Sequence, residues 1–354
     1  MALSVSAETV NNTNLAAATR SLMLKGVKDQ VVMKNPILAR LALNNRVNWQ
    51  GGTSIHQPVR KADLASLVQA YGPNDPLTAQ KKTLYERPWF DWRYAQIPLV
   101  YDIEEKLQNM SGGGDTQIFN LATELSRLGL EGLRIYLTQC LYEIPASGTT
   151  QLASSDTPTT NRRFQSINQA LTHDATYGHL TRATTTTNSW WQGASISEAY
   201  TDQSTDYGWS VNTIRQAVQA VSLYTPERAD LLVVVGDVGH LAIKREIEGS
   251  LHYNPPAGPL VKYGFDSYMI DGVEVVHDPW LRNSKVANAH KWMFVVNTKD
   301  FELRLHPSRA FEMEPFQWQG NVVNGVDQWL SRIMLAGNFV CWKPNGSIML
   351  LALT

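Results

Sequence analysis

The feature of this sequence that most constrains its fold is a long hairpin whose arms have no purely apolar face. We predict extended arms at residues 53–61 and 83–101, flanking the turn-forming segment YGPNDP at residues 71–76. In the second arm, large aromatic and charged side chains are mixed on both faces. An isolated hairpin is only marginally stable in water, and aromatic plus arginine surface is typical of a contact between chains. The sequence therefore predicts a projecting hairpin that packs on a neighbouring chain.

The contact is predicted to involve a run of aromatic and charged side chains in the second arm. A mixture of this kind could also stack single-stranded nucleic acid. The acidic residues Glu86 and Asp91 in the same arm disfavour that alternative, so protein contact is preferred. Both hypotheses predict loss of function when a tryptophan is replaced by alanine, but only protein contact predicts loss of assembly without nucleic acid. The predicted contact residues are Tyr85, Arg87, Trp89, Phe90, Asp91, Trp92, Arg93 and Tyr94.

Length and composition indicate a globular chain of about two domains. The sequence has 354 residues, 43% of them hydrophobic and 18% charged, with 11 tryptophans, which excludes a disordered or coiled-coil class. A formal net charge of -1 argues against a basic domain that binds duplex DNA, so any nucleic-acid contact should be local and weak. The two cysteines, Cys140 and Cys341, lie in apolar contexts and are expected to be buried thiols in a reducing compartment.

The N-terminal segment carries no secretion or membrane signal. Residues 1–24 are polar and rich in Asn, Thr and Ala, and lack a basic start followed by an apolar run. No window reaches the roughly 20 consecutive apolar residues needed to cross a bilayer. We expect residues 1–21 to form a flexible or partner-dependent arm, and the protein to stay in the cytoplasm or in a particle assembled there.

A long helix is predicted at residues 115–141, after the glycine joint Gly112-Gly113-Gly114. Apolar residues recur there at spacings of three and four, and Pro145 should end the helix. Gly129 and Gly132 lie inside it, where each costs about 1 kcal/mol relative to alanine, which indicates a bend or a close contact. Under the bend hypothesis, alanine at both positions would stiffen the helix.

The rest of the chain predicts a mixed α+β fold. Residues 146–210 are loop-dominated around a helical piece at 164–171, and a helix at 211–223, a buried strand at 230–235 and a helix at 238–247 follow. Asp271-Gly272 is a strong two-residue hairpin signal between strands 267–270 and 273–277. Further strands are expected at 292–296 and 301–305, and a last hairpin should join 333–342 to 347–353 around Pro344-Asn345-Gly346.

No motif in the sequence indicates an enzyme. Residues 233–240 (VVVGDVGH) have the strand, turn and helix outline of a nucleotide site, but both glycine-rich phosphate motifs are absent. His173 and His179 fit no common zinc spacing and are interpreted as loop histidines, and the acidic cluster at residues 102–105 as a solvated strand end. No nucleophile elbow or metalloprotease motif is present. We therefore predict no catalytic residue, cofactor or metal.

In their order and spacing, these pieces resemble the major capsid protein of tailed bacteriophages, with the Hong Kong 97 fold. The match covers nearly the whole chain. Local phrases are also similar to that family: KNPILARL at residues 34–41 ahead of GTSI at 52–55, and YMIDGVEV at 268–275 followed by Asp278-Pro279.

The resemblance implies a role for each region. It implies an N-terminal arm at residues 1–50, an extended loop at 51–110 lying over the adjacent subunit, and a peripheral domain at 111–225 containing the spine helix 115–141. Residues 226–298 would form the axial domain, with Asp271 and Gly272 at its hairpin turn, and 299–354 would return to the peripheral domain. Gly129 and Gly132 are the candidates for a bend in the spine helix.

The same resemblance implies the partners and location. Copies of the chain would form hexamers and pentamers of an icosahedral shell, assembled in the host cytoplasm and found in the virion around double-stranded DNA. The resemblance also implies three kinds of partner: a separate scaffolding protein, a portal and decoration proteins. It implies no contact with a membrane. Lys81 and Lys82 lie in the loop through which some relatives cross-link their subunits, but no acceptor can be identified, so no covalent bond is predicted.

Two other classes of protein remain open from the sequence. An encapsulin-like compartment would have the same fold and would carry cargo protein in place of DNA. An α/β enzyme that uses the turn at residues 233–240 would bind a nucleotide saturably, and nucleotide-induced thermal stabilisation would expose it.

Overall fold

A computed structural model of the chain describes most of its central and C-terminal residues. The described ranges are 35–44, 47–73, 75–76, 79–108, 121–143, 162–172, 176–182, 188–194, 210–225, 227–249, 266–283, 292–318 and 328–350. Several expectations lie outside these ranges. They concern most of the N-terminal arm, the glycine joint, the start of the spine helix, Pro145, His173, and much of the segment 146–210.

The chain divides into two compact units. Among the described residues, the first unit is drawn from Gln96–Ile135 and Phe311–Met334. The second unit is drawn from Asn35–Ala95, Tyr136–Ala310 and Leu335–Thr354. Each unit is therefore assembled from segments that are far apart in the sequence.

A five-stranded mixed sheet forms the centre of the second unit. Its order is β14 (Ile348–Leu350), β10 (Met293–Asn297), β7 (Leu231–Val235), β9 (Val273–His277) and β8 (Ser267–Ile270). Strands β7 and β9 are parallel, with Val233 paired to Val275, and the other neighbours are antiparallel. All five residues of β7 are buried. This confirms the prediction, from its continuous apolar run, of a strand buried on both faces.

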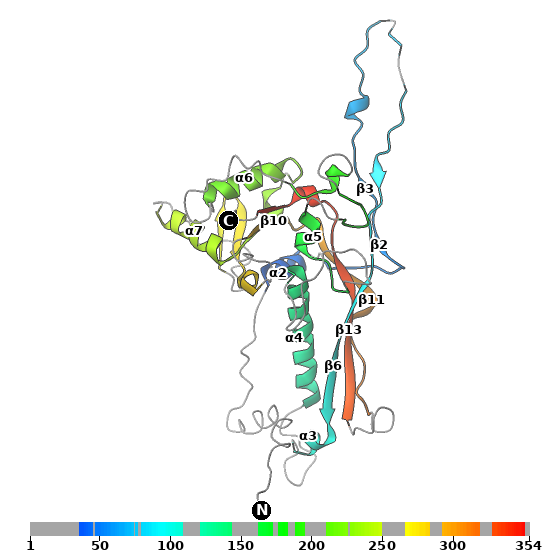
Figure 1. Ribbon diagram of the computed structural model, residues 1–354, viewed down its shortest axis with the longest axis vertical. Coiled ribbons are helices and arrows are strands. Elements are labelled where there is room, and N and C mark those ends of the chain that lie inside the picture. Colours follow the sequence, from blue (N-terminus) through cyan, green and yellow to red (C-terminus); the bar gives the residue numbers. More distant parts are fainter. Residues whose placement is uncertain are drawn as a thin grey trace, which may run out of the picture. The chain divides into compact units, whose positions relative to one another are not determined.

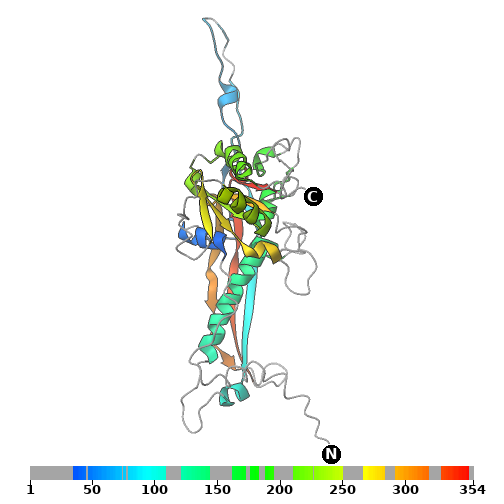
Figure 2. The same ribbon diagram turned by 90° about the vertical axis from the view of Figure 1, so that its left-hand side faces the viewer.

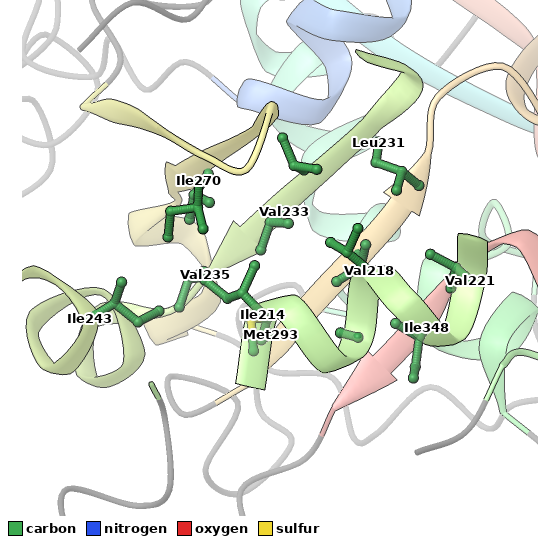
Figure 3. Close-up of a cluster of buried hydrophobic side chains, with 14 of the residues drawn as sticks. Ile214, Val218, Val221, Leu231, Val233, Val235, Ile243, Ile270, Met293 and Ile348 are labelled. Carbon is green, nitrogen blue, oxygen red and sulfur yellow. The ribbon is translucent and has the colours of Figure 1, made fainter. Parts of the chain in front are cut away.

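Helices α6 (Val211–Ser222) and α7 (Asp237–Gly249) pack against this sheet. Helix α6 places Ile214, Val218 and Val221 at helical spacing on the sheet, where they meet Val233 and other β-branched side chains (Figure 3). Ser210 caps the start of α6, because its hydroxyl accepts a hydrogen bond from the backbone N–H of Thr213. Helix α2 (Pro36–Leu43) also contacts β7. The observed bounds of these helices lie within two residues of the predicted ones where a prediction was made.

The turn between β8 and β9 has the geometry that its sequence predicts. Asp271 and Gly272 have φ angles of 48° and 83°, and the flanking residues Ile270 and Val273 are paired. Two consecutive positive φ angles match the right-handed twist of a two-residue hairpin.

A second five-stranded sheet contains the longest strands. Its path is β1 (Val47–Trp49), β11 (Phe301–Met313), β13 (Gln328–Cys341) and β12 (Gln317–Trp318), and β6 (Arg93–Asp102) also pairs with β13. Strand β1 is parallel to β11, with Val47 opposite Leu303. Strand β11 is longer than predicted and continues through Pro307. The proline lies beyond the residues of β11 that pair with β1, so a missing N–H is tolerated there.

Two sequence predictions about strand pairing are wrong. Residues 83–101 were predicted as one hairpin arm, but β6 leaves the hairpin and pairs with β13. A terminal hairpin was predicted around Pro344, but β13 and β14 lie in different sheets, because β14 pairs with β10. The Pro344–Gly346 segment forms a 3-10 turn, and a Cβ on Gly346 would lie 2.8 Å from the Thr225 hydroxyl. Tertiary packing therefore redirects the chain at both points.

Most of helix α4 belongs to the first unit, where it runs alongside β6, as Figures 1 and 2 both show. The helix spans Leu121–Leu141 and ends at the predicted residue. A Cβ on Gly129 would lie 2.8 Å from Leu99 Cδ2 and 2.9 Å from Ile333 Cδ1, and one on Gly132 would lie 3.0 Å from Ile97 Cδ1. The close-contact interpretation of these glycines is therefore supported by geometry. The bend stays a prediction.

The remaining elements are short. They are α3 (Ile103–Gln108), α5 (Ile167–Leu171), β2 (Ile55–His56), β3 (Val59–Arg60), β4 (Tyr85–Glu86), β5 (Trp89–Phe90) and the 3-10 turns Ala65–Leu67, Ser189–Trp191, Arg228–Asp230, Pro279–Asn283 and Pro344–Gly346. Both cysteines are free and buried, as predicted.

We expect Gly129→Ala to destabilise the protein and Gly132→Ala to leave its stability nearly unchanged. Each gains about 1 kcal/mol of helix propensity, but Gly129→Ala must displace the ends of two buried side chains, Leu99 and Ile333, at a cost of about 1–3 kcal/mol. Gly129→Ala should therefore lower the free energy of unfolding, and Gly132→Ala should change it by less than about 0.5 kcal/mol. Urea denaturation of the two variants measures both values. Equal stabilisation by both would show that the helix does not need the close approach at Gly129.

The buried carboxylate of Asp278 accepts hydrogen bonds from three parts of the second unit: the residue after α4, the residue before α2, and the 3-10 turn at Pro279–Asn283. Asp278 Oδ2 accepts hydrogen bonds from the Tyr142 hydroxyl at 2.7 Å and the Asn35 amide at 3.2 Å, and its Oδ1 accepts one from the Trp280 N–H at 2.9 Å. Asn35 also caps α2, because its side chain accepts from the Leu38 N–H. Asp278 is fully buried, and burial is the main cause that raises its pKa to about 6.

The raised pKa of Asp278 predicts a pH dependence of stability. The ordinary value of this carboxyl is 3.8, so between about pH 4 and pH 6 the folded protein holds a proton that the unfolded protein releases. The stabilisation is complete below pH 4 and is lost as the pH rises through 6. The free energy of unfolding of the wild type, minus that of Asp278→Asn, should therefore fall by about 3 kcal/mol between pH 4 and pH 7. Urea titrations of dispersed subunits measure it, with Asp63→Asn on the exposed hairpin as the control. Parallel curves for wild type and Asp278→Asn would contradict the prediction.

Candidate assembly interface

The hairpin at residues 53–90 is held by two very short antiparallel ladders. Strand β2 pairs with β5 through Ile55 and Phe90, and β3 pairs with β4 through Val59 and Glu86. Gln57-Pro58 and Arg87-Pro88 separate the ladders on the two arms, since a proline offers no N–H to a ladder. Beyond β3 and β4, the Lys61 N–H donates to the Leu84 carbonyl at 2.8 Å, and Lys61 Nζ pairs with Glu86 at 2.7 Å.

We call residues 62–83 the hairpin tip. Figures 1 and 2 show it standing clear of the other elements of its unit. Its described hydrogen bonds include Lys82 Nζ to the Ser66 hydroxyl at 2.7 Å and the Gly72 N–H to Asp75 at 2.6 Å. Its apolar side chains are exposed: Leu64 by 51%, Val68 by 80% and Tyr71 by 72%. The tip forms hydrogen bonds within itself while its apolar side chains are exposed, and an exposed apolar surface of this kind is suited to bind a partner.

By contrast, most of the hairpin root, by which we mean residues 55–56 and 89–93, is buried in its own unit. The Phe90 ring lies 5.0 Å from the Tyr177 ring and 5.6 Å from the Trp342 ring, both edge-on. The Trp92 indole N–H donates to the Gly52 carbonyl at 2.9 Å, and the Asn338 amide donates to the Asp91 carbonyl at 3.1 Å. Aromatic pairs of this geometry add about 0.5–1.5 kcal/mol each to the burial of their area. The root is therefore fixed while the tip is exposed.

Residues 176–182, which we call the root clamp, hold the outer face of the hairpin root. The His179 ring stacks on the Trp89 ring at a centroid distance of 3.4 Å, and its Nε2 lies 3.4 Å from Asp91 Oδ2. The Trp89 N–H donates to the Gly178 carbonyl at 3.2 Å. Gly178 and His179 both have positive φ, 59° and 57°. A Cβ on Gly178 would lie 2.9 Å from Phe90 Cζ, so glycine is needed both for backbone conformation and for space.

The predicted contact residues fall into two groups. Phe90, Trp92 and Arg93 are buried by the chain itself and anchor the root, so they offer no free surface to a partner. The exposed residues are Tyr85, Arg87, Trp89 and Tyr94, and Asp91 is half-buried. The sequence could not separate the two groups, because aromatic and charged side chains are mixed on both faces of this arm.

Sequence reasoning missed two parts of this site. It assigned no role to the exposed apolar residues of the tip, Leu64 and Val68, because no periodicity marks them. It also interpreted His179 as an ordinary loop histidine, and the contact of His179 with Trp89 joins residues 90 positions apart. Only the folded chain brings them together.

In the nucleotide-like turn at residues 233–240, the N-terminus of α7 is already covered by side chains of this chain. Asp237 Oδ1 at the start of α7 lies 2.6 Å from His277 Nε2, and the His277 ring stacks on His240 at 4.7 Å. Burial, and then the charge of His277, lower the pKa of His240, whose Nε2 lies 3.2 Å from Asp266. A carboxylate at the helix N-terminus already uses the positive end of the helix dipole, which disfavours a phosphate there.

The described ranges contain neither a membrane-spanning helix nor a metal centre. No described helix is long and apolar enough to cross a bilayer. No group of three or more His, Cys, Asp or Glu among the described residues is arranged to hold a metal ion.

Comparison with solved structures identifies the fold. A chain of the cyanophage A-1(L) capsid asymmetric unit superposes with a TM-score of 0.63 at 15% identity, covering 94% of this chain and 96% of its own. A chain of the mature capsid of bacteriophage PhiM1 superposes with a TM-score of 0.55 at 10% identity, covering 92% of this chain and 90% of its own. A chain of the capsid of a native GTA particle superposes with a TM-score of 0.51 at 12% identity, covering 95% of this chain and 97% of its own. No protein-family model and no curated protein matches the sequence.

The chain therefore has the fold of bacteriophage capsid proteins. The agreement spans more than nine-tenths of this chain and nine-tenths or more of each of these three. The α+β capsid fold predicted from the order of the sequence elements is confirmed.

We expect Gly178→Ala to loosen the hairpin root. The substitution places a Cβ at a positive φ and 2.9 Å from Phe90, at an expected cost of about 1–3 kcal/mol. Hydrogen exchange of the Trp89 and Lys61 amides should become faster in the variant. The matched control is Gly272→Ala, which has a positive φ with nothing within 4 Å and lies in another hairpin. Unchanged exchange in Gly178→Ala would show that the clamp does not hold the root.

Proposed function

We propose that this chain is the major capsid protein of a tailed bacteriophage, of the Hong Kong 97 type. Copies of it build hexamers and pentamers of an icosahedral shell around packaged double-stranded DNA. The observation that carries the proposal is the exposed apolar hairpin tip on a buried root, within a chain whose fold matches phage capsid chains over nearly its whole length.

The regions take the roles expected of such a shell protein. Residues 1–50 form the N-terminal arm, the hairpin at 53–90 forms the extended loop, since β6 joins the sheet of β13, and 226–298 form the axial domain. Residues 111–225 and 299–354 form the peripheral domain, with α4 as the spine helix. In support, four of the five strands of the β7-centred sheet lie within residues 226–298.

The hairpin makes the contact between copies. Its tip contributes Leu64, Val68 and Tyr71, and the exposed aromatic residues Tyr85 and Trp89 extend the surface toward the root. A hairpin on one copy that packs on a different surface of the next copy is a heterologous contact, which closes into rings. Such contacts account for apolar side chains that the single chain leaves in water.

The partners follow from this role. A separate scaffolding protein, a portal and decoration proteins act on the shell, and DNA contacts are weak and non-specific, which agrees with a formal net charge of -1. The chain has no catalytic role in the proposal and works in the virion. The occupied turn at residues 233–240 favours this over a nucleotide-binding enzyme.

The proposal is tested by removing the hairpin tip. We expect the wild-type protein to form closed shells in negative-stain images, and a variant in which Asn-Gly replaces residues 62–83 to remain dispersed. The ladders of β2–β5 and β3–β4 should persist, so the variant should keep the circular dichroism of a folded subunit.

The matched control is Leu223→Ser, which removes a side chain that is 81% exposed outside the hairpin and should leave shells intact. Shells formed by the tipless variant, or a wild-type protein that stays monomeric at high concentration, would refute the proposal. Thermal stabilisation by nucleotides would favour the enzyme, and a shell loaded with protein in place of DNA would indicate an encapsulin-like compartment.

A further inference from the structure

The start of helix α7 meets the open end of the β8–β9 hairpin through polar side chains. Asp237, His240 and Lys244 follow at spacings of three and four residues, so they share one face of α7. On the sheet, Asp266 immediately precedes β8 and His277 ends β9, and the main-chain N–H of His277 donates to the Asp266 carbonyl at 3.3 Å. The two sheet residues that face the helix are therefore cross-strand neighbours.

Two reciprocal histidine–carboxylate pairs join the helix to the sheet. His277 Nε2 lies 2.6 Å from Asp237 Oδ1. His240 Nε2 lies 3.2 Å from Asp266 Oδ2, to which Lys244 Nζ also donates at 3.0 Å. The His240 and His277 rings stack with their centroids 4.7 Å apart. Each element therefore contributes one histidine and one carboxylate, and the two rings are in contact.

The surroundings of His240 favour its neutral form. Its side chain is buried, and its Nδ1 is covered and has no hydrogen-bond partner among the residues that the structure describes. When Nε2 donates to Asp266, a neutral ring carries no proton on Nδ1, whereas a protonated ring would hold a buried N–H there without an acceptor. The added charge would also lie against the His277 ring. Burial is the largest cause that lowers the pKa of His240 below 6.5, and the charge of His277 is the second.

The other ionisable side chains around the His240 ring do not reverse this preference. The Asp266 carboxylate favours a protonated ring and the Lys244 charge disfavours it, and the pKa of His240 is lowered nonetheless. From β8, the Tyr268 ring lies 5.7 Å from the His240 ring. Tyr268 stays neutral in acid, so it adds no charge to the contact.

We propose that this contact is an acid-sensitive switch. It holds the first turns of α7 on the β8–β9 hairpin while His240 is neutral, and it releases them when His240 takes up a proton. Ala242 and Ile243 keep another face of α7 in the apolar core, so the release is confined to the start of the helix. The switch lies within one chain, so it goes beyond the proposed function and does not depend on assembly.

The sign of the pH dependence follows from the lowered pKa of His240. Below pH 6.5 the released ring takes up a proton that the bound ring resists, so acid weakens the contact. Asp278, next to His277, has the opposite effect, because in acid the folded protein holds a proton on its carboxylate. Glu246 lies farther along α7, where it accepts a hydrogen bond from the Val211 N–H of α6 at 2.7 Å. The response of α7 itself, compared between the wild type and variants of His240, separates the switch from these groups.

Hydrogen exchange of dispersed subunits tests the switch. After correction for the intrinsic effect of pH, the opening equilibrium of the α7 amides near His240 should rise by at least about threefold between about pH 7.5 and about pH 5. His240→Gln should abolish this rise, because the glutamine amide can still donate to Asp266 but does not titrate. The matched control is His306→Gln, which replaces a histidine of β11 that packs on Trp92 outside the contact, and it should respond as the wild type does.

Two further variants decide the outcome if His240→Gln does not fold. Asp266→Asn removes the carboxylate that favours the charged ring, so the rise in acid should become larger. His277→Gln removes the like charge, so the rise should become smaller. An equal rise in the wild type and His240→Gln would overturn the inference, and so would a rise that neither Asp266→Asn nor His277→Gln changes. Because no shell is involved in these measurements, either result leaves the proposed function standing.

Discussion

Burial of the hairpin root is the interaction on which the rest of this structure depends. Phe90 packs on Tyr177 and Trp342, and the root clamp stacks His179 on Trp89. Two ladders of two residues each could not hold a hairpin in water by themselves. The aromatic contacts fix the start of the hairpin, and the tip can then project its apolar residues without collapsing onto its own unit. The same burial redirects the chain after Trp92 into β6, where it joins the sheet of β13.

Rigidity at the root and exposure at the tip suit the proposed role in assembly. A projecting segment loses conformational entropy when it docks, and a preorganised root reduces that loss. In the proposed shell, the apolar side chains of the tip, which are exposed in the single chain, gain burial against another chain.

Elements with strong local signals were predictable from the sequence. The apolar run of β7, the amphipathic face of α6 and the Asp271-Gly272 turn were placed to within one or two residues, because burial on both faces, helical periodicity and paired positive φ angles are local properties. The order of the elements, with a few local sequence phrases, carried the resemblance to a capsid protein from which the fold was predicted. Strand pairing was less accessible: Pro344-Asn345-Gly346 has the composition of a hairpin turn, yet β13 and β14 lie in different sheets, because β14 pairs with β10.

For the assembly surface, the sequence by itself determined that a hairpin rich in aromatic and charged residues projects from an α+β chain, since such a composition cannot form a core of its own. Only the tertiary structure decided which of those side chains remain free. Phe90, Trp92 and Arg93 turn inward because the residues that cover them come from distant segments. Periodicity reports which residues share a face of a strand, whereas the identity of the covering surface is a long-range property that appears only when the chain folds.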